Sequence, residues 1–369
     1  MTINYVPILL TKKGELSALN DLSDDVKARF TPLFTVQPIP YDYDNDTSKA
    51  VDQHVLGLGK KIATAWGIRR AFLDPIFLRN EFLQPGAPEP METLLSDAAA
   101  EGLLLTPVVA PGQSPEYTAL ATAWHSANRT GICVRLTSEQ WPISPPRAYA
   151  LDSLLDALAV EPADIDLVLD LGAAVTNGLA VETVIMTLQA LPHASEWKTV
   201  TLAGGAFPEN LTNMDRTRLN RVPRTEWATF TQVCTEARAA GARIPDFGDY
   251  GIAHPDPAVS EVNPAFMQIS AQQRYTIDGH WLVAKGELFK GRAGTGVGGA
   301  ATFPLARMIA AASEFCGADY SPGDAWIAST AEGVGTGGSP LTWRRHGTSH
   351  HITFVTGSLA IPDEPSAGS

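Results

Sequence analysis

Short apolar runs alternate with amphipathic stretches over about the first 250 residues. The runs are rich in Leu and β-branched residues, as is typical of strands buried on both faces. Stripes of period 3.6, such as Leu16, Leu19, Leu22 and Val26, mark helices between them. Eight such units predict a (β/α)₈ TIM-like barrel of parallel strands. The runs are Tyr5–Leu10, Thr31–Val36, Ala71–Ile76, Leu103–Val109, Gly131–Leu136, Asp166–Leu171, Lys198–Leu202 and Arg243–Phe247.

The pattern changes after residue 250. Three short runs predict strands at Met267–Ala271, Arg274–Ile277 and Trp281–Ala284, and Asp278-Gly279 is a strong hairpin signal between the last two. We therefore expect a β-hairpin insertion after strand 8. Two further elements are expected as C-terminal additions, a helix over 305–315 that closes the barrel and a late strand at 352–355.

These elements divide the chain into parts of one continuous fold. Residues 1–258 hold the barrel strands and helices, and residues 259–300 hold the β insertion and a glycine-rich loop. Residues 301–361 hold the closing helix and the C-terminal strand. Residues 362–369 have no apolar pattern and are expected to form a loose tail.

Composition narrows the function classes. The chain has 369 residues and a net charge of −13, which argues against an extended nucleic-acid surface. The three cysteines, Cys133, Cys234 and Cys316, are far apart, which favours free thiols and a cytoplasmic location. There is no apolar run of about 18 residues and no apolar core of a signal peptide, so we expect no membrane association.

Charged residues recur just past the predicted strands, where a barrel of this kind carries its chemistry. The acidic ones are candidates for acid/base catalysis, and the others, with Tyr250, for holding an anion. The alternative is that they only cap and solvate the barrel mouth. The acidic candidates are Glu15, Asp74, Asp170, Asp246 and Asp249, and the ligand-binding candidates at the strand ends are Lys12, Arg135 and Tyr250.

Further candidates for an anion site lie later in the chain. Gly204-Gly205 follows the seventh strand, where backbone N–H groups can bind phosphate, although a tight turn would also explain the pair. Four residues of the insertion and C-terminal region could face the same ligand, namely Arg274, Lys285, Arg344 and His351. His346 and His350 have a metal-chelating spacing only on a helix, and the intervening residues argue against one, so no metal site is predicted and the cofactor is unknown.

The glycine-rich loop Gly291–Gly299 contains a GxGxxG spacing. It follows a hairpin rather than the first strand of a βαβ unit, which argues against dinucleotide binding. A lid that covers the barrel mouth is the preferred interpretation, and a plain linker is the alternative.

Several short phrases of the sequence form a recognisable set. They are Tyr5-Val-Pro-Ile-Leu9, Lys13-Gly-Glu15, Thr31-Pro-Leu-Phe34, Asp74, Arg274-Tyr275 and Trp343-Arg-Arg with His350-His351-Ile. Together they resemble the beta family, which is named after the beta protein of a satellite bacteriophage. The resemblance runs over most of the chain and implies a setting in phage–host conflict, either anti-phage defence or restraint of a toxic partner encoded nearby. It implies no catalytic mechanism.

Two classes of function follow. In the first, the barrel mouth binds an anionic, phosphorylated or nucleotide-like molecule, as a sensor or as an enzyme with hydrolase- or lyase-type acid/base chemistry. In the second, the barrel is a scaffold and the insertion docks a protein partner. The sequence leaves open whether any reaction occurs.

Overall fold

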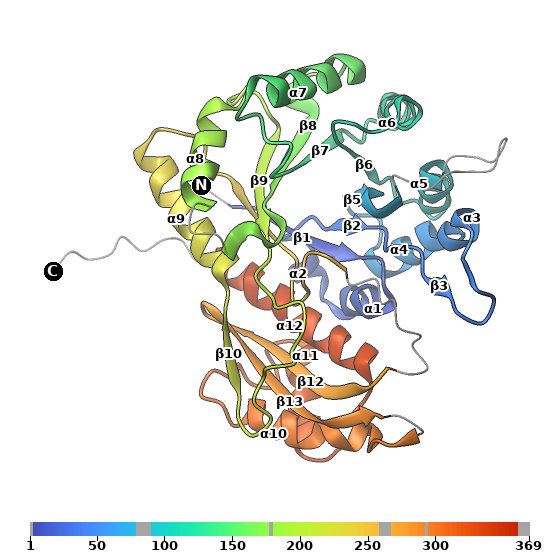
Figure 1. Cartoon of the computed structure of the whole chain (residues 1–369), viewed down its shortest axis with the longest axis vertical. Helices are drawn as coiled ribbons and strands as arrows, with labels where there is room; N and C mark the ends of the chain where they lie inside the picture. The colour runs from blue at the N-terminus through green and yellow to red at the C-terminus, as the bar shows by residue number, and fades with distance from the viewer. Residues whose placement is uncertain (1–2, 79–89, 177–179, 258–266, 292–293, 361–369) are drawn as a thin grey trace.

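The computed structural model describes residues 3–78, 90–176, 180–257, 267–291 and 294–360. All eight apolar runs form strands of one closed parallel barrel, with the order β1-β11-β9-β8-β7-β6-β5-β2 (Figure 1). The predicted (β/α)₈ fold is confirmed. The strands are β1 (Tyr5–Leu10), β2 (Leu33–Thr35), β5 (Phe72–Asp74), β6 (Thr106–Val109), β7 (Ile132–Thr137), β8 (Ile165–Asp170), β9 (Thr199–Gly204) and β11 (Asp246–Asp249).

Helices and short connections surround this barrel. Some start at clear sequence signals: Ser114 caps one helix by accepting a hydrogen bond from the backbone of Tyr117, with Pro115 in the first turn. A small hairpin, β3 (Tyr41–Asp42) and β4 (Thr47–Ser48), follows β2. The helices are α1 (Lys13–Asp21), α2 (Asp24–Lys27), α3 (Val51–Val55), α4 (Leu58–Trp66), α5 (Pro90–Ala100), α6 (Pro115–Asn128), α7 (Pro145–Leu158), α8 (Ala180–Ala190) and α9 (Thr225–Ala239), with short 3₁₀ turns η1 (Ile76–Leu78), η2 (Pro162–Asp164) and η3 (Gly172–Thr176).

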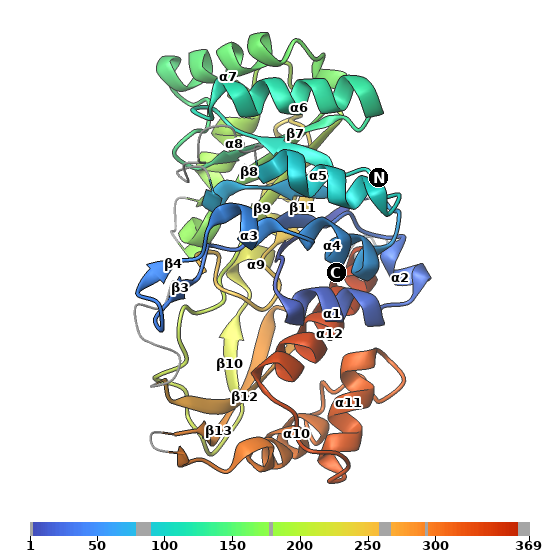
Figure 2. The same ribbon diagram turned by 90° about the vertical axis from the view of Figure 1, so that its right-hand side faces the viewer.

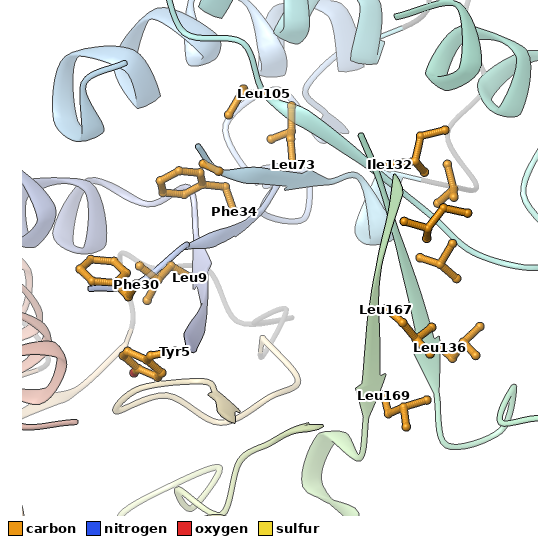
Figure 3. Packing of buried hydrophobic residues seen from close by; sticks show 14 of the residues in the cluster. Tyr5, Leu9, Phe30, Phe34, Leu73, Leu105, Ile132, Leu136, Leu167 and Leu169 are labelled. Carbon is orange, nitrogen blue, oxygen red and sulfur yellow. The ribbon is translucent and has the colours of Figure 1, made fainter. Parts of the chain in front are cut away.

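Side chains alternate between the two faces of the barrel strands. Outward side chains such as Leu9, Phe34 and Leu73 pack in one large cluster with the helices (Figure 3). Inward side chains such as Ile8 and Cys133 fill the interior, so the barrel is a packed core rather than a channel. Space for chemistry remains only where the strands end.

A second, smaller unit packs below the barrel (Figure 2). Its antiparallel sheet has the order β10-β13-β12, with β12 (Ile269–Ile277) and β13 (His280–Lys290) joined by the predicted Asp278-Gly279 turn. The two short runs expected before that turn are one continuous strand, β12. Strand β10 (Asn220–Pro223) was not predicted and comes from the β9–α9 connection. The turn η5 (Gly298–Thr302) and helices α10 (Phe303–Ala310) and α11 (Pro322–Ala331) complete this unit.

The C-terminal prediction is wrong in two respects. Residues 352–355 are not a strand but belong to helix α12 (Pro340–Ala360). This helix packs against both α1 and β12 (Figure 2), so residues Gly347 to Ile352 are all buried and no polar face reveals a helix. The expected closing helix is α10, which ends at Ala310 and packs on the antiparallel sheet instead, and α12 closes the barrel.

Two of the expected boundaries cannot be compared with the structure, because they fall outside the residues that it describes. The expected division at 258/259 and the expected tail 362–369 both lie outside the described residues. Among the described residues, none of the helices combines the length and the apolar character needed to cross a bilayer.

Candidate functional site

Four of the predicted strand-end residues form one buried cluster at the barrel mouth. Arg135 donates from Nη1 to Asp74 at 2.5 Å, from Nε and Nη2 to Asp170 at 3.0 and 2.6 Å, and to the Tyr250 hydroxyl at 2.6 Å. Tyr250 in turn donates to Asp170 at 2.6 Å. Burial alone would lower the pKa of Arg135, but Tyr250, Asp170 and Asp74 outweigh it and raise it well above its usual value. Each of these four side chains has a hydrogen-bond partner within the cluster, which is typical of a structural role. We call this cluster the plug.

A narrow cavity, called the inner cavity below, lies next to this cluster. Arg135 and Tyr250 are among the residues that line it. Its volume of about 20 Å³ is room for about one water molecule. Glu15 from α1 lines it and is the only predicted acidic candidate outside the plug that does so. Thr35, at the end of β2, is 2% exposed, and its hydroxyl has no hydrogen-bond partner among the described residues.

Two arginines border the junction between the barrel and the smaller unit. Arg274 of β12 and Arg344 of α12 both donate to the carbonyl of Ile252, at 2.5 and 3.2 Å. Arg274 also reaches Gln272 Oε1 at 3.1 Å and lies 4.2 Å above the ring of Phe207. No carboxylate among the described residues pairs with Arg274. Burial and the neighbouring Arg344 lower its pKa well below the usual value, so this is a cation held without its usual compensation.

The start of α1 brings two more charged groups to the same place. Glu15 lies in the first turn of α1, where the helix dipole favours a negative charge, and is 3.6 Å from Arg344 Nε. Gly14 is required for this approach, because a Cβ there would lie 2.7 Å from Arg344 Cγ. Lys12 precedes the helix, and desolvation together with Arg344 lowers its pKa although Glu15 raises it. The junction thus gathers three cations around one carboxylate.

A second cavity, called the outer cavity below, adjoins Arg274 and Arg344. It has a volume of about 120 Å³, and Gln272, Arg274, Trp343 and Arg344 are among the residues that line it. Ile252 and Arg344 line both cavities. The predicted anion site near Arg274 and Arg344 therefore has space beside it, large enough for several water molecules.

Three of the predicted site residues, Asp246, Asp249 and His351, lie away from the two cavities. Asp246 begins β11 instead of ending it and accepts hydrogen bonds from Asn4, so it lies at the opposite end of the barrel. Asp249 points outward, where it accepts from Tyr5 at 2.8 Å and contacts His351 Nε2 at 2.9 Å. His351 also contacts the Thr276 hydroxyl at 2.8 Å, so both residues tie the barrel to the smaller unit.

The glycine pair and the predicted lysine are explained by packing. A Cβ on Gly204 would lie 2.3 Å from Val175, one on Gly205 would lie 2.9 Å from Pro255, and Gly205 donates its N–H to Gly172. That N–H is therefore already used inside the protein. Lys285 donates to the carbonyls of Leu211 and Thr212 at 2.6 and 3.0 Å and anchors that loop. We correct these three assignments to structural roles.

The histidines of α12 do not form a metal site. The helix that their spacing requires exists, contrary to expectation, but His346 stacks on Trp326 with ring centroids 4.7 Å apart. His350 contacts Asp324 and the Thr276 carbonyl, each at 2.8 Å. Within the described ranges there is no cluster of three or more His, Cys, Asp or Glu side chains that could hold a metal ion.

The glycine-rich loop is exposed over residues 294–297, but its end at Gly299 packs against a second glycine-rich segment, Gly333–Gly338. A Cβ on Gly299 would lie 1.9 Å from the carbonyl oxygen of Thr336, so this loop fits tightly against the second glycine-rich segment. Described residues of the loop are absent from the lining of both junction cavities. The expectation of a lid over the barrel mouth is not supported for these residues, and residues 292–293 lie outside the described chain.

Sequence reasoning missed two polar residues of the inner cavity. Thr35 ends the observed strand β2 but lies inside the predicted run Thr31–Val36, where a threonine gives no signal of its own. His254 lines the cavity, and its Nε2 has no hydrogen-bond partner among the described residues, whereas Nδ1 contacts the backbone of Asp256. His254 stands just after the last barrel strand, in the position where the rim argument could have found it.

The fold and the cavities define a (β/α)₈-barrel protein with a candidate site at the carboxyl ends of its strands. The chain belongs to the Beta protein family, whose profile matches residues 5–357. No curated protein matches the chain.

Solved structures show only weak similarity to the chain. Tryptophan synthase from M. tuberculosis has 10% identity and a TM-score of 0.32, over 68% of this chain and 83% of that one. Triosephosphate isomerase from Bartonella henselae has 9% identity and a TM-score of 0.24, over 66% and 90%. These values carry no argument about function.

Proposed function

We propose that this protein binds an anionic, phosphorylated ligand at the junction of the barrel mouth and the smaller unit. The observation that carries the proposal is the gathering of Lys12, Arg274 and Arg344 around a single carboxylate, Glu15. Arg274 and Arg344 are half-buried, and a guanidinium that is partly removed from water without a paired anion is unfavourable, so a bound anion would relieve that cost. Guanidinium groups also match the oxygen geometry of phosphate.

Ligand-induced stabilisation tests the proposal. The full chain is screened by thermal shift against phosphate, sulfate, nucleotides and sugar phosphates, since a ligand that binds only the folded state raises the melting temperature. We expect at least one phosphorylated probe to raise it and Arg274→Gln and Arg344→Gln to abolish the shift. Arg29→Gln, which removes an exposed arginine elsewhere, is the matched control. The absence of stabilisation by every probe would overturn the proposal.

A catalytic role is the second candidate, favoured by Glu15 and His254, which line the same cavity. Asp74 and Asp170 are poor candidates for proton transfer because Arg135 pairs with both. The acid/base pair of a hydrolase or lyase would then be Glu15 and His254. Turnover of a phosphorylated probe that both Glu15→Gln and His254→Asn abolish would support catalysis; binding without turnover in all variants would favour a sensor.

We also propose a setting in phage–host conflict, with a protein partner encoded nearby, as the likeness to the beta protein of a satellite bacteriophage suggests. Cells that express the wild type or Arg274→Gln are infected, and plaques are counted. Protection by the wild type alone would link the junction site to this role. Equal plaque numbers with and without the protein would contradict the setting.

A further inference from the structure

The two junction cavities share a wall but differ in chemistry. The inner cavity, about 20 Å³, enters the barrel mouth, where Ile8, Leu10 and Thr35 are among its walls. The outer cavity, about 120 Å³, is bordered by Arg274 and Arg344. A ligand that occupies both must therefore present different groups at its two ends.

The outer end has an excess of positive charge. Arg274 and Arg344 line the outer cavity, and no carboxylate is among its described lining residues, which leaves two cations there without a compensating anion. A phosphomonoester carries a charge of about −1.5 to −2 at pH 7 and offers three acceptor oxygens. A single carboxylate would leave one cation uncompensated. The charge balance thus favours a phosphoryl dianion at the outer end.

The inner end has the opposite balance. Glu15 lines the inner cavity, and Arg135, which also lines it, is held between Asp74 and Asp170, so the charged groups at this end are more negative than positive. A second anionic group there would be repelled. The Thr35 hydroxyl, buried and without a described partner, needs a hydrogen-bonding group to satisfy it. The inner end therefore suits an uncharged, hydroxylated group, and the small volume admits only a small one.

We propose that the ligand is a phosphomonoester of a small neutral polyol. Its phosphoryl group and carbon body occupy the outer cavity between Arg274 and Arg344, and a single hydroxyl enters the inner cavity toward Thr35. This inference rests on the proposed anion-binding function and specifies the chemical class of the ligand.

Isothermal titration of the full chain with three probes tests this inference. The probes are inorganic phosphate, glycerol 3-phosphate and 3-phosphoglycerate, which adds a carboxylate to the body. We expect glycerol 3-phosphate to bind about tenfold tighter than inorganic phosphate, and 3-phosphoglycerate to bind more weakly than glycerol 3-phosphate, because of the inner negative charge.

Two variants separate the ends of the ligand. Thr35→Val keeps the side-chain volume and should weaken glycerol 3-phosphate about fivefold while leaving inorganic phosphate unchanged. Arg274→Gln should weaken both by about tenfold or more, as expected for loss of a charged hydrogen bond. Arg29→Gln is the control for a general charge effect.

The outcomes distinguish the two proposals. If inorganic phosphate binds through Arg274 but the ester is no tighter, or Thr35→Val has no effect on the ester, the polyol assignment is overturned and anion binding stands. Equal or tighter binding of 3-phosphoglycerate overturns the uncharged inner end. If none of the probes binds, or if Arg274→Gln leaves binding unchanged, anion binding at this site is itself overturned.

Discussion

The barrel plug and the arginine pair are neighbours that use the same side chain in opposite ways. Arg135 is 4% exposed and bonds to two carboxylates and a phenol. Arg274 bonds to a backbone carbonyl and an amide, and no carboxylate among the described residues forms an ion pair with it. Arg274 is also only half-buried. The difference is whether the protein itself supplies the counter-charge.

Removal of Arg135 should have the largest effect. Arg135→Met leaves Asp74 and Asp170 buried without their cation, and we expect the free energy of unfolding to fall by about 3–5 kcal/mol. Chemical denaturation measures this loss. Adding D74N and D170N removes the uncompensated charges and should recover part of it. A loss below about 1 kcal/mol would show that the plug is not the structural element described here.

Glu226 is intermediate between Arg135, which is fully paired, and Arg274, which has no paired carboxylate. Only one of the two carboxylate oxygens of Glu226 has a partner among the described residues. It is buried, Arg224 donates to it at 3.1 Å, and its Oε2 has no partner among the described residues. Burial raises its pKa from 4.5 to about 7 despite Arg224. The folded state therefore holds this proton more tightly than the unfolded state.

The resulting pH dependence has a defined sign. The contribution of Glu226 to stability is fully present below about pH 4.5 and is lost as pH rises through about 7. The loss is about 3 kcal/mol, at 1.36 kcal/mol per pKa unit. Unfolding free energies measured from pH 4 to 8 should fall more steeply for the wild type than for Glu226→Gln. Parallel curves for the two proteins would refute the raised pKa.

Arg274→Met should cost far less stability than Arg135→Met. The change removes a cation without leaving a carboxylate unpaired, so we expect a loss within about 1 kcal/mol. The same denaturation experiment measures it. A loss as large as that of Arg135→Met would remove the distinction between the two arginines.

Thr35→Val should have the smallest effect on stability. The substitution deletes a buried hydroxyl without a described partner and keeps the shape of the side chain. We expect a change within about 0.5 kcal/mol, with the sign toward stabilisation. Thermal unfolding without ligand is the measurement, and a clear loss of stability would indicate that the hydroxyl is already hydrogen-bonded.

The barrel could be predicted because each of its strands is marked by residues that are neighbours in the sequence. Each strand is a short buried run, and Asp74, Asp170 and Arg135 lie at or near the ends of theirs, so their place at the barrel mouth could be predicted, whereas their mutual pairing could not. Asp246 shows the sensitivity of this reasoning to boundaries. Strand β11 runs over Asp246–Asp249, whereas the expected run ended at Phe247. That shift moves Asp246 to the opposite end of the barrel.

Helix α12 and the arrangement of the junction site could not be predicted, because they depend on contacts between residues that are distant along the chain. Helix α12 is covered by the barrel on one side and by the smaller unit on the other, which removes the polar face that periodicity needs. Arg274 and Arg344 were named as ligand candidates, but their shared carbonyl partner, Ile252, could not be read from the sequence. His254 and Thr35 carry no motif and become visible only when the cavity is known.

The position of α12 has a consequence for biosynthesis. All eight barrel strands have been made once residue 249 is complete, but the helix that covers α1 and β1 ends at residue 360. At about 5–20 residues per second, a ribosome needs roughly 5–20 s to make the intervening segment. During that interval the apolar surface that receives Ile352 and Val355 lacks its cover. We therefore expect the nascent barrel to expose this apolar surface to chaperones until α12 leaves the exit tunnel.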